Sequence, residues 1–321
     1  MDKCNVLALS GGGYRGLFTI RVLRKLEEAL SKPISEHFDI ITGTSIGGII
    51  ALGIAAGINL AEMEEIFVDQ GNSIFPKPVK NHTTRKMRAF FSPIHSADGL
   101  KKVLKELFTN KTMGELKQAH VIVPAANLTT GKPKMFKTPY SNELFLDSSL
   151  KVVDVALATS AAPVYFPMHK IEDLKTRFSD GGLVGNAPGL FGWLEAEEYF
   201  GVNRENISVL AVGTLGGAPN VSSKTDLEQG ASFWLNPSNP RLLNFLMSQQ
   251  EYLSHFMLSR LLKNRYEIID TTISADSASD IALDDTSQSA QDTLIARAES
   301  EFSMFLRTDF YKNQILSSQP N

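Results

Sequence analysis

Two glycine-bearing turns near the N-terminus carry the residues whose types and spacing could do chemistry. The segment 43–47 reads Gly-Thr-Ser-Ile-Gly and follows the apolar run Phe38–Thr42. A serine between two glycines at a strand-to-helix turn is a nucleophile elbow, in which the tight turn projects the hydroxyl outward. Glycines are needed there because side chains would collide with the neighbouring element. We therefore expect Ser45, supported by Gly43 and Gly47, to be the nucleophile of an acyl-transfer site.

The earlier turn, residues 11–16, reads Gly-Gly-Gly-Tyr-Arg-Gly and follows the strand-like run Val6–Leu9. Consecutive glycines can offer free backbone N–H groups to a developing oxyanion. The same residues also satisfy the G-x-G-x-x-G dinucleotide fingerprint in a strand-turn-helix setting. A dinucleotide site, however, needs an acid at the end of the second strand, and Asp39 lies at the start of that strand. The pattern favours a hydrolase, with a dinucleotide-binding α/β module as the alternative.

A serine hydroxyl is a poor nucleophile until a base takes its proton. The six histidines do not lie in a glycine-flanked loop after a strand, where a triad histidine is expected: His37, His82, His95, His120, His169 and His255. Asp180 is better placed, because it follows a short apolar strand and precedes Gly181 and Gly182. A desolvated aspartate could act as the base, although Asp-Gly is also a common turn pair. His169 is the rival base.

Composition limits the class of protein. The chain has 321 residues, 43% of them hydrophobic and 21% charged, which fits one large α/β domain or one domain plus an appendage. A net charge of −3 and a pI near 6.1 give no overall drive towards nucleic acid or anionic membranes. The single cysteine, Cys4, excludes an intrachain disulfide, and the strand starting at Asn5 leaves no room for a signal peptide. We expect a cytoplasmic protein that needs neither a metal nor a cofactor.

Apolar segments with strand-like and helix-like patterns alternate along the chain, which predicts a mostly parallel sheet covered by helices on both faces. The uncharged stretch 40–61 is long enough to span a bilayer, but its glycines favour a buried strand, turn and helix. We expect one domain over residues 1–321, with a core at about 5–215 and a largely helical extension at about 216–321. The expected strands are 5–9, 38–42, 120–127, 175–179, 207–212 and 266–273. The expected helices are 17–30, 46–56, 60–70, 100–108, 152–158, 190–200, 233–264 with a break at 236–240, and 288–312.

Cations and aromatic residues are interleaved between Asp69 and Asp98, where no acidic residue occurs. Such a segment suits an anionic lipid interface, although a solvated basic loop, a regulator site or a lid would have the same composition. The candidate contacts for membrane or regulator are Lys77, Arg85, Arg88, Phe90 and Phe91.

The glycine run, the serine elbow and the Asp-Gly-Gly turn, in this order and spacing, resemble the patatin-like phospholipase family. The likeness extends to Ala158–Pro167, to Asn186 and Pro188, and to Ile207–Gly213, so that it covers about residues 5–215. It implies a patatin-like three-layer α/β/α fold, with Ser45 and Asp180 as a catalytic dyad. It also implies that the backbone amides of Gly11, Gly12 and Gly13 form an oxyanion hole. The residues that support these motifs would be Arg15, Gly16, Gly43, Gly47, Gly181 and Gly182. Many members carry an acid where this chain has Ser10.

Members of this family cleave fatty acyl esters of phospholipids or galactolipids without calcium. The resemblance therefore implies an acyl-serine intermediate that is hydrolysed by water activated by the aspartate. The layout is also similar to the bacterial patatin-like phospholipases that cyclic dinucleotides switch on in antiphage defence. This implies a phospholipid substrate, a cyclic dinucleotide activator and peripheral membrane contact. The alternative is a constitutive (lyso)phospholipase or lipid esterase without nucleotide control. The sequence does not give the preferred headgroup, the acyl position that is cleaved or the oligomeric state.

Overall fold

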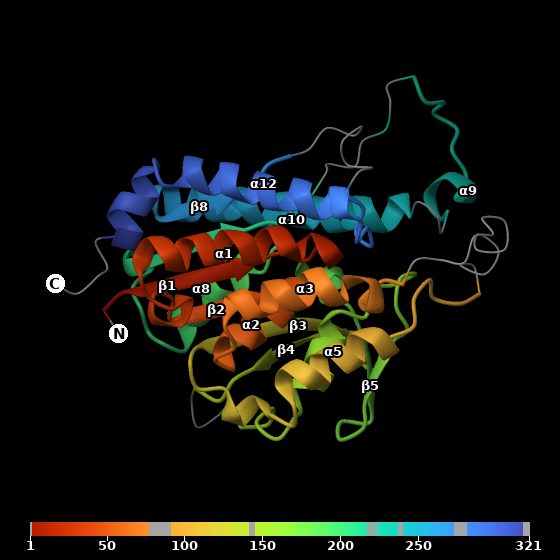
Figure 1. Cartoon of the computed structure of the whole chain (residues 1–321), viewed down its shortest axis with the longest axis horizontal. Coiled ribbons are helices and arrows are strands. Elements are labelled where there is room, and N and C mark those ends of the chain that lie inside the picture. The colour runs from red at the N-terminus through yellow and green to blue at the C-terminus, as the bar shows by residue number, and fades with distance from the viewer. Residues whose placement is uncertain are drawn as a thin grey trace.

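The computed structural model describes residues 2–76, 91–140, 145–216, 221, 224–236, 240–272 and 281–316. Its centre is a mixed sheet with the strand order β5-β6-β3-β2-β1-β7-β8, and β4 pairs with β3 outside this path. Figure 1 shows the sheet enclosed by helices. The strands are β1 (Cys4–Leu9), β2 (Ile40–Gly43), β3 (His120–Asn127), β4 (Lys132–Lys137), β5 (His169–Ile171), β6 (Thr176–Ser179), β7 (Ile207–Val212) and β8 (Tyr266–Ile269).

The strands from β3 through β2, β1 and β7 to β8 are all parallel, whereas β4, β5 and β6 pair antiparallel at one edge. No strand is predicted at β4 or β5, because most of their residues are polar or only half-buried. In the central register Leu9 pairs with both Gly43 and Val212, so that β1, β2 and β7 end at the same level. The glycine run and the serine elbow follow directly at this carboxyl edge, where open α/β sheets bind their ligands.

Helices cover both faces of the sheet. Leu7 and Leu9 point into the larger apolar cluster with α1 and α2, whereas Val6 and Ala8 point the other way, towards Trp193 of α8 and residues of α10. This alternation along β1 produces the three layers that the sequence predicts. The helices are α1 (Gly16–Leu30), α2 (Ile46–Ala55), α3 (Leu60–Ile74), α5 (Asp98–Phe108), α6 (Val152–Thr159), α7 (Gly182–Gly185), α8 (Gly189–Glu198), α9 (Ala231–Trp234), α10 (Arg241–Leu262) and α12 (Gln288–Phe305).

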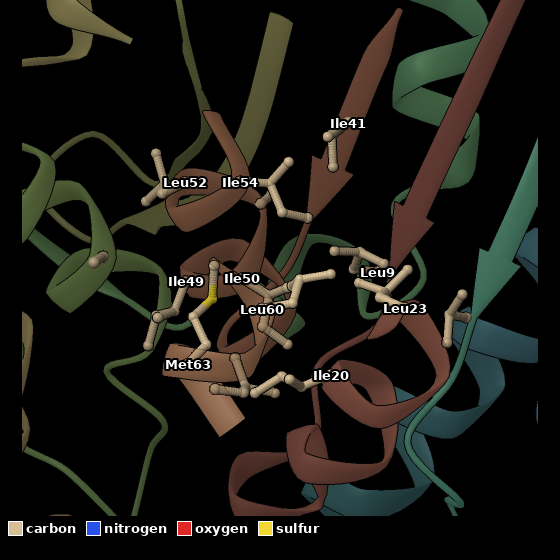
Figure 2. Packing of buried hydrophobic residues seen from close by; sticks show 14 of the residues in the cluster. Leu9, Ile20, Leu23, Ile41, Ile49, Ile50, Leu52, Ile54, Leu60 and Met63 are labelled. Atoms are coloured by element: carbon tan, nitrogen blue, oxygen red, sulfur yellow. The ribbon is translucent and has the colours of Figure 1, made fainter. Parts of the chain in front are cut away.

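Helix α2 is buried along its whole length, which explains why the stretch 40–61 carries no charge. Figure 2 shows Ile49, Ile50 and Ile54 of α2 among side chains from β1, β2 and α1. Met63 of α3 lies against Gly53, where even a Cβ atom would come within 2.5 Å of its methyl group. The stretch is therefore strand, turn and core helix, as predicted. Within the described part of the chain, no helix has the length and apolar character needed to cross a bilayer.

The C-terminal residues complete the same sheet. β8 pairs with β7 in parallel, α12 packs along α1, and α10 packs against α7 and α8 (Figure 1). The helix predicted over 288–312 ends at Phe305 and is followed by a π-helical turn, Tyr311–Ile315. The helical stretch predicted over 233–264, with a break at 236–240, corresponds to α9 and α10; residues 237–239 lie outside the described residues.

Candidate active site

Ser45 lies in a strained turn between β2 and α2. Its backbone has φ 54° and ψ −120°, a conformation that a residue with a side chain rarely adopts. The flanking glycines make the turn possible, since a Cβ on Gly43 would lie 2.1 Å from the Gly47 carbonyl oxygen. A Cβ on Gly47 would lie 2.2 Å from the Leu9 carbonyl oxygen. This geometry is that of the predicted nucleophile elbow.

The Ser45 hydroxyl donates a hydrogen bond of 2.8 Å to Oδ2 of Asp180. Asp180 follows β6 and is 2% exposed, and its Oδ1 accepts a 2.7 Å hydrogen bond from the Gly182 N–H. Burial raises the pKa of Asp180 from 3.8 to about 6, against the two hydrogen bonds, which favour the charged form. The carboxylate is therefore more basic than an exposed aspartate and still ionised near neutral pH.

Thr159 fixes the elbow relative to the aspartate. The Ser45 N–H donates to Oγ1 of Thr159 at 3.0 Å, and this hydroxyl donates in turn to the Pro124 carbonyl at 2.7 Å. The Thr159 carbonyl accepts from the Gly181 N–H, and a Cβ on Gly181 would lie 2.3 Å from the Pro124 carbonyl oxygen. Thr159 therefore bonds both the serine turn and the aspartate turn, which holds the two side chains at bonding distance.

The glycine loop between β1 and α1 agrees with the sequence prediction only in part. The Gly11 N–H donates to the Asn186 carbonyl at 3.2 Å, so this amide already has a partner, and its predicted part in an oxyanion hole stays a prediction. Among the described residues, the N–H groups of Gly12 and Gly13 have no hydrogen-bond partner. A Cβ on Gly12 would lie 2.2 Å from Oγ1 of Thr214, and one on Gly16 would lie 2.2 Å from Ile46. The close packing explains why both positions are glycine.

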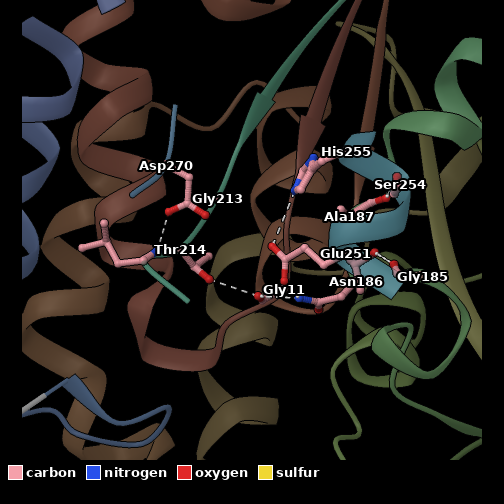
Figure 3. A network of polar contacts seen from close by, with 12 residues as sticks. Gly11, Gly185, Asn186, Ala187, Gly213, Thr214, Glu251, Ser254, His255 and Asp270 are labelled. Atoms are coloured by element: carbon pink, nitrogen blue, oxygen red, sulfur yellow. Dashed lines mark hydrogen bonds and ion pairs between the residues drawn. The ribbon is translucent and has the colours of Figure 1, made fainter. Parts of the chain in front are cut away.

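A polar network lies behind the glycine loop, and Figure 3 shows its members. Asn186 Nδ2 donates to the Gly11 carbonyl at 3.3 Å and to Oε2 of Glu251 on α10 at 3.1 Å. The other oxygen of Glu251 lies 3.8 Å from Nε2 of His255. Glu251 connects α10 to the loop, a connection that sequence analysis missed. The available signal was the single acid of α10.

Arg15 and Asp270 extend this network. Burial lowers the pKa of the Arg15 guanidinium, and the nearby carboxylates of Glu251 and Asp270 act in the opposite direction. Burial, with Glu251 second, raises the pKa of Asp270 from 3.8 to about 7. Asp270 Oδ1 accepts hydrogen bonds from the N–H groups of Leu215 and Thr271, both at 2.9 Å. Arg15, expected as a supporting residue, thus interacts electrostatically with two carboxylates from the C-terminal residues.

The histidines have other partners. His169 Nε2 lies 2.9 Å from Oδ1 of Asp154, and His95 Nε2 lies 3.0 Å from Oδ2 of Asp284. No histidine in the described ranges bonds Ser45, and His82 lies outside them. Within the same ranges, no group of three or more His, Cys, Asp or Glu could hold a metal ion.

Most of the basic-aromatic segment lies outside the described residues, namely Lys77, Arg85, Arg88 and Phe90. Phe91 is described and is 87% exposed. The predicted contact with membrane or regulator stays a prediction.

A strained serine bonded to a buried aspartate, at the carboxyl edge of a parallel sheet, defines an α/β serine hydrolase. The family model "Patatin-like phospholipase" matches residues 7–190, a range that includes both side chains, and the chain belongs to this family of phospholipases. Family membership decides between the two interpretations of the glycine loop in favour of the hydrolase.

Several relatives are similar over most of the chain. A cGAMP-activated phospholipase of Pseudomonas aeruginosa is 44% identical over 90% of this chain and 85% of its own length. A cGAMP-activated phospholipase of Escherichia coli is 36% identical over 98% of this chain and 92% of its own. A cUMP-AMP-activated phospholipase of Escherichia coli is 28% identical over 65% of this chain and 64% of its own.

Proposed function

We propose that this phospholipase hydrolyses acyl esters of membrane phospholipids with Ser45 as nucleophile and Asp180 as base. The observation that carries the proposal is the 2.8 Å hydrogen bond from the elbow hydroxyl to the buried carboxylate. Burial supplies the basicity that an isolated aspartate lacks, because it raises the pKa of Asp180 to about 6. Ser45 therefore has a base within hydrogen-bond reach without a histidine.

In the first half-reaction Asp180 takes the Ser45 proton as Oγ attacks the ester carbonyl. The oxyanion that forms accepts hydrogen bonds from the Gly12 and Gly13 N–H groups, and losing one such donor typically costs about 3 kcal/mol of barrier. The intermediate collapses to an acyl-serine, and the protonated Asp180 gives its proton to the departing alcohol. In the second half-reaction Asp180 deprotonates a water molecule as it attacks the acyl group. The protonated Asp180 then returns this proton to Ser45 Oγ as the fatty acid leaves, which restores the free enzyme.

The proposed activator is the cyclic dinucleotide cGAMP. The relatives that are 44% and 36% identical over most of the chain are cGAMP-activated, whereas the cUMP-AMP-activated relative is only 28% identical. The constitutive (lyso)phospholipase remains the second candidate, and a role in antiphage defence stays a prediction. Peripheral membrane contact through Lys77, Arg85 and Arg88 is also proposed, on the basis of their charge and of the exposed Phe91 that follows them in the sequence.

The decisive experiment measures fatty acid release from vesicles of phosphatidylethanolamine and phosphatidylglycerol, with cGAMP, with cUMP-AMP and without nucleotide. We expect release only with cGAMP, and no release by Ser45→Ala protein under any condition. A serine-directed fluorophosphonate should label the wild type at Ser45 alone. Equal release without nucleotide would favour the constitutive enzyme, and undiminished release by Ser45→Ala protein would refute the assigned nucleophile.

A further inference from the structure

The side of α10 that faces away from the protein is mostly apolar. Seven of its side chains are between 40% and 58% exposed, and we call these residues the α10 outer face: Leu242, Leu246, Tyr252, Leu253, Phe256, Met257 and Leu261. The remaining exposed residues of the helix are Gln249, Ser259 and Arg260, so that α10 exposes no carboxylate. Large contiguous apolar surfaces are uncommon on monomeric proteins and mark interaction sites.

The exposed residues form one continuous stripe, because they recur at intervals of three and four along the helix. The opposite side of α10 contacts the segment that follows Asp180. Met247 lies against Gly182, whose N–H bonds the Asp180 carboxylate, and the Ser254 hydroxyl donates to the Ala187 carbonyl at 2.9 Å. One helix therefore has the active site on its inner side and an apolar stripe on its outer side.

Aromatic and cationic residues lie at both ends of the stripe. At the N-terminal end, Trp234 of α9 contacts the rings of Phe233 and Phe245, and the Arg241 guanidinium lies 4.3 Å from the Phe233 ring centre. Figure 1 shows α9 at this end of α10. At the other end Arg260 lies 5.4 Å from the ring of Phe256. Helices that lie on membranes combine such an apolar stripe with cations and aromatic rings at headgroup level.

We propose that the α10 outer face is a docking surface for a phospholipid bilayer. This inference rests on the proposed function, since a substrate held in a bilayer must be met at its surface. The apolar stripe would enter the headgroup region, and Arg241 and Arg260 would meet anionic phosphates, with no exposed acid on the helix to oppose them. Because the inner side of α10 contacts residues 182–187, docking by the outer side brings the active site to the lipid.

The test measures vesicle binding separately from hydrolysis. Full-length Ser45→Ala protein, which cannot consume the vesicles, is sedimented with phosphatidylethanolamine–phosphatidylglycerol vesicles, with and without cGAMP. Adding Leu253→Gln and Phe256→Gln should weaken binding by about tenfold or more, because two large apolar side chains lose their burial in lipid. The matched control is Met304→Gln on α12, which removes a side chain of similar exposure, 53%, from another surface. Binding of this control should equal that of the parent.

A second readout does not depend on how well the glutamine variants fold. Cys4 is fully buried, so Gln249→Cys introduces one accessible thiol into the stripe without removing an apolar residue. A polarity-sensitive dye at position 249 should shift to the blue on adding vesicles, and the same dye after Met304→Cys should not.

Equal vesicle binding by the Leu253→Gln, Phe256→Gln protein and its parent, or equal dye shifts at positions 249 and 304, would overturn the proposal. The proposal would also fail if the parent protein alone is a dimer that these substitutions dissociate, since the stripe would then join two copies of the chain. Loss of binding without loss of soluble-ester hydrolysis by the corresponding Ser45-containing protein supports docking. Undiminished hydrolysis by Ser45→Ala protein, or hydrolysis that does not depend on cGAMP, would instead contradict the proposed function and not the docking surface.

Discussion

Asn186 bonds both the N–H and the carbonyl of Gly11. Its carbonyl accepts from the Gly11 N–H at 3.2 Å, and its side-chain Nδ2 donates to the Gly11 carbonyl at 3.3 Å. The same Nδ2 reaches Glu251 on α10. The Gly12 and Gly13 amides follow Gly11 directly, so their orientation depends on this contact. Asn186 is therefore a positioning residue for the proposed oxyanion hole, and α10 acts on the loop through it.

Replacing Asn186 with alanine removes the side-chain bonds and leaves the backbone bond to Gly11 in place. We expect kcat to fall about tenfold to a hundredfold on a soluble short-chain ester, because the two oxyanion donors are less well fixed. KM should change little. Unfolding should become easier by about 1–3 kcal/mol, because Glu251 loses a buried partner. The control is the exposed Asn203→Ala, and a normal kcat for Asn186→Ala would show that the side chain does not position the loop.

The residues that could be predicted from sequence are those whose role is fixed locally. Ser45 and Asp180 each follow an apolar strand and adjoin glycines, so a short segment reveals the turn that presents them. The bond that the Gly11 N–H already makes is to Asn186, which is 175 residues further along the chain. No local pattern near residue 11 carries this information.

Helix α10 illustrates a second limit. Leu246 and Leu253 are exposed while Leu258 and Leu262 are buried, and the sequence contains leucines in both cases. The apolar content predicts a helix, but it does not tell which side packs on the protein. The difference arises from α8 and the loop after Asp180, which are separated from α10 by more than forty residues. The role of Glu251 follows from the same packing.

Two glycines with nearly the same φ angle allow the glycine loop to be tested. Gly13 has φ 59° and Gly201 has φ 64°, so alanine strains both by about 1–2 kcal/mol. A Cβ at Gly13 would also lie 2.4 Å from the Leu283 carbonyl oxygen, whereas nothing lies within 4 Å of one at Gly201. We expect Gly13→Ala to shift the loop and lower hydrolysis about a hundredfold or more, and Gly201→Ala to retain it. Equal activities of the two variants would show that the geometry of the glycine loop does not control catalysis.

The rate of hydrolysis should follow the ionisation of Asp180. Only the carboxylate accepts a proton, so kcat/KM on a soluble ester should rise with pH through about 6 and level off above it. A histidine has an ordinary pKa near 6.5 and could give a similar curve. His169→Ala should therefore keep both the rate and the profile, since His169 is bonded to Asp154 and not to Ser45. If His169→Ala protein lacked the rise of kcat/KM with pH, His169 and not Asp180 would be the base.

Asp180 should also reduce the stability of the folded protein above pH 6. Its pKa is raised on folding, so its contribution to the free energy of unfolding is greatest below about 4, decreases up to about 6 and is constant beyond. A shift from 3.8 to about 6 corresponds to about 3 kcal/mol. The amide introduced by Asp180→Asn does not titrate, so the melting temperature of this variant relative to wild type should increase between pH 4 and pH 7.5.

Ser45→Ala should change stability in the opposite direction. The Ser45 hydroxyl donates to the Asp180 carboxylate and holds its pKa down, so removing the hydroxyl raises that pKa further. The melting temperature of Ser45→Ala relative to wild type should therefore decrease over the same range of pH, while that of Asp180→Asn increases. Scanning calorimetry on the three proteins at both pH values measures this difference directly, and contributions from other titrating groups cancel. If both variants shifted in the same direction, the stability changes would not arise from the buried charge on Asp180.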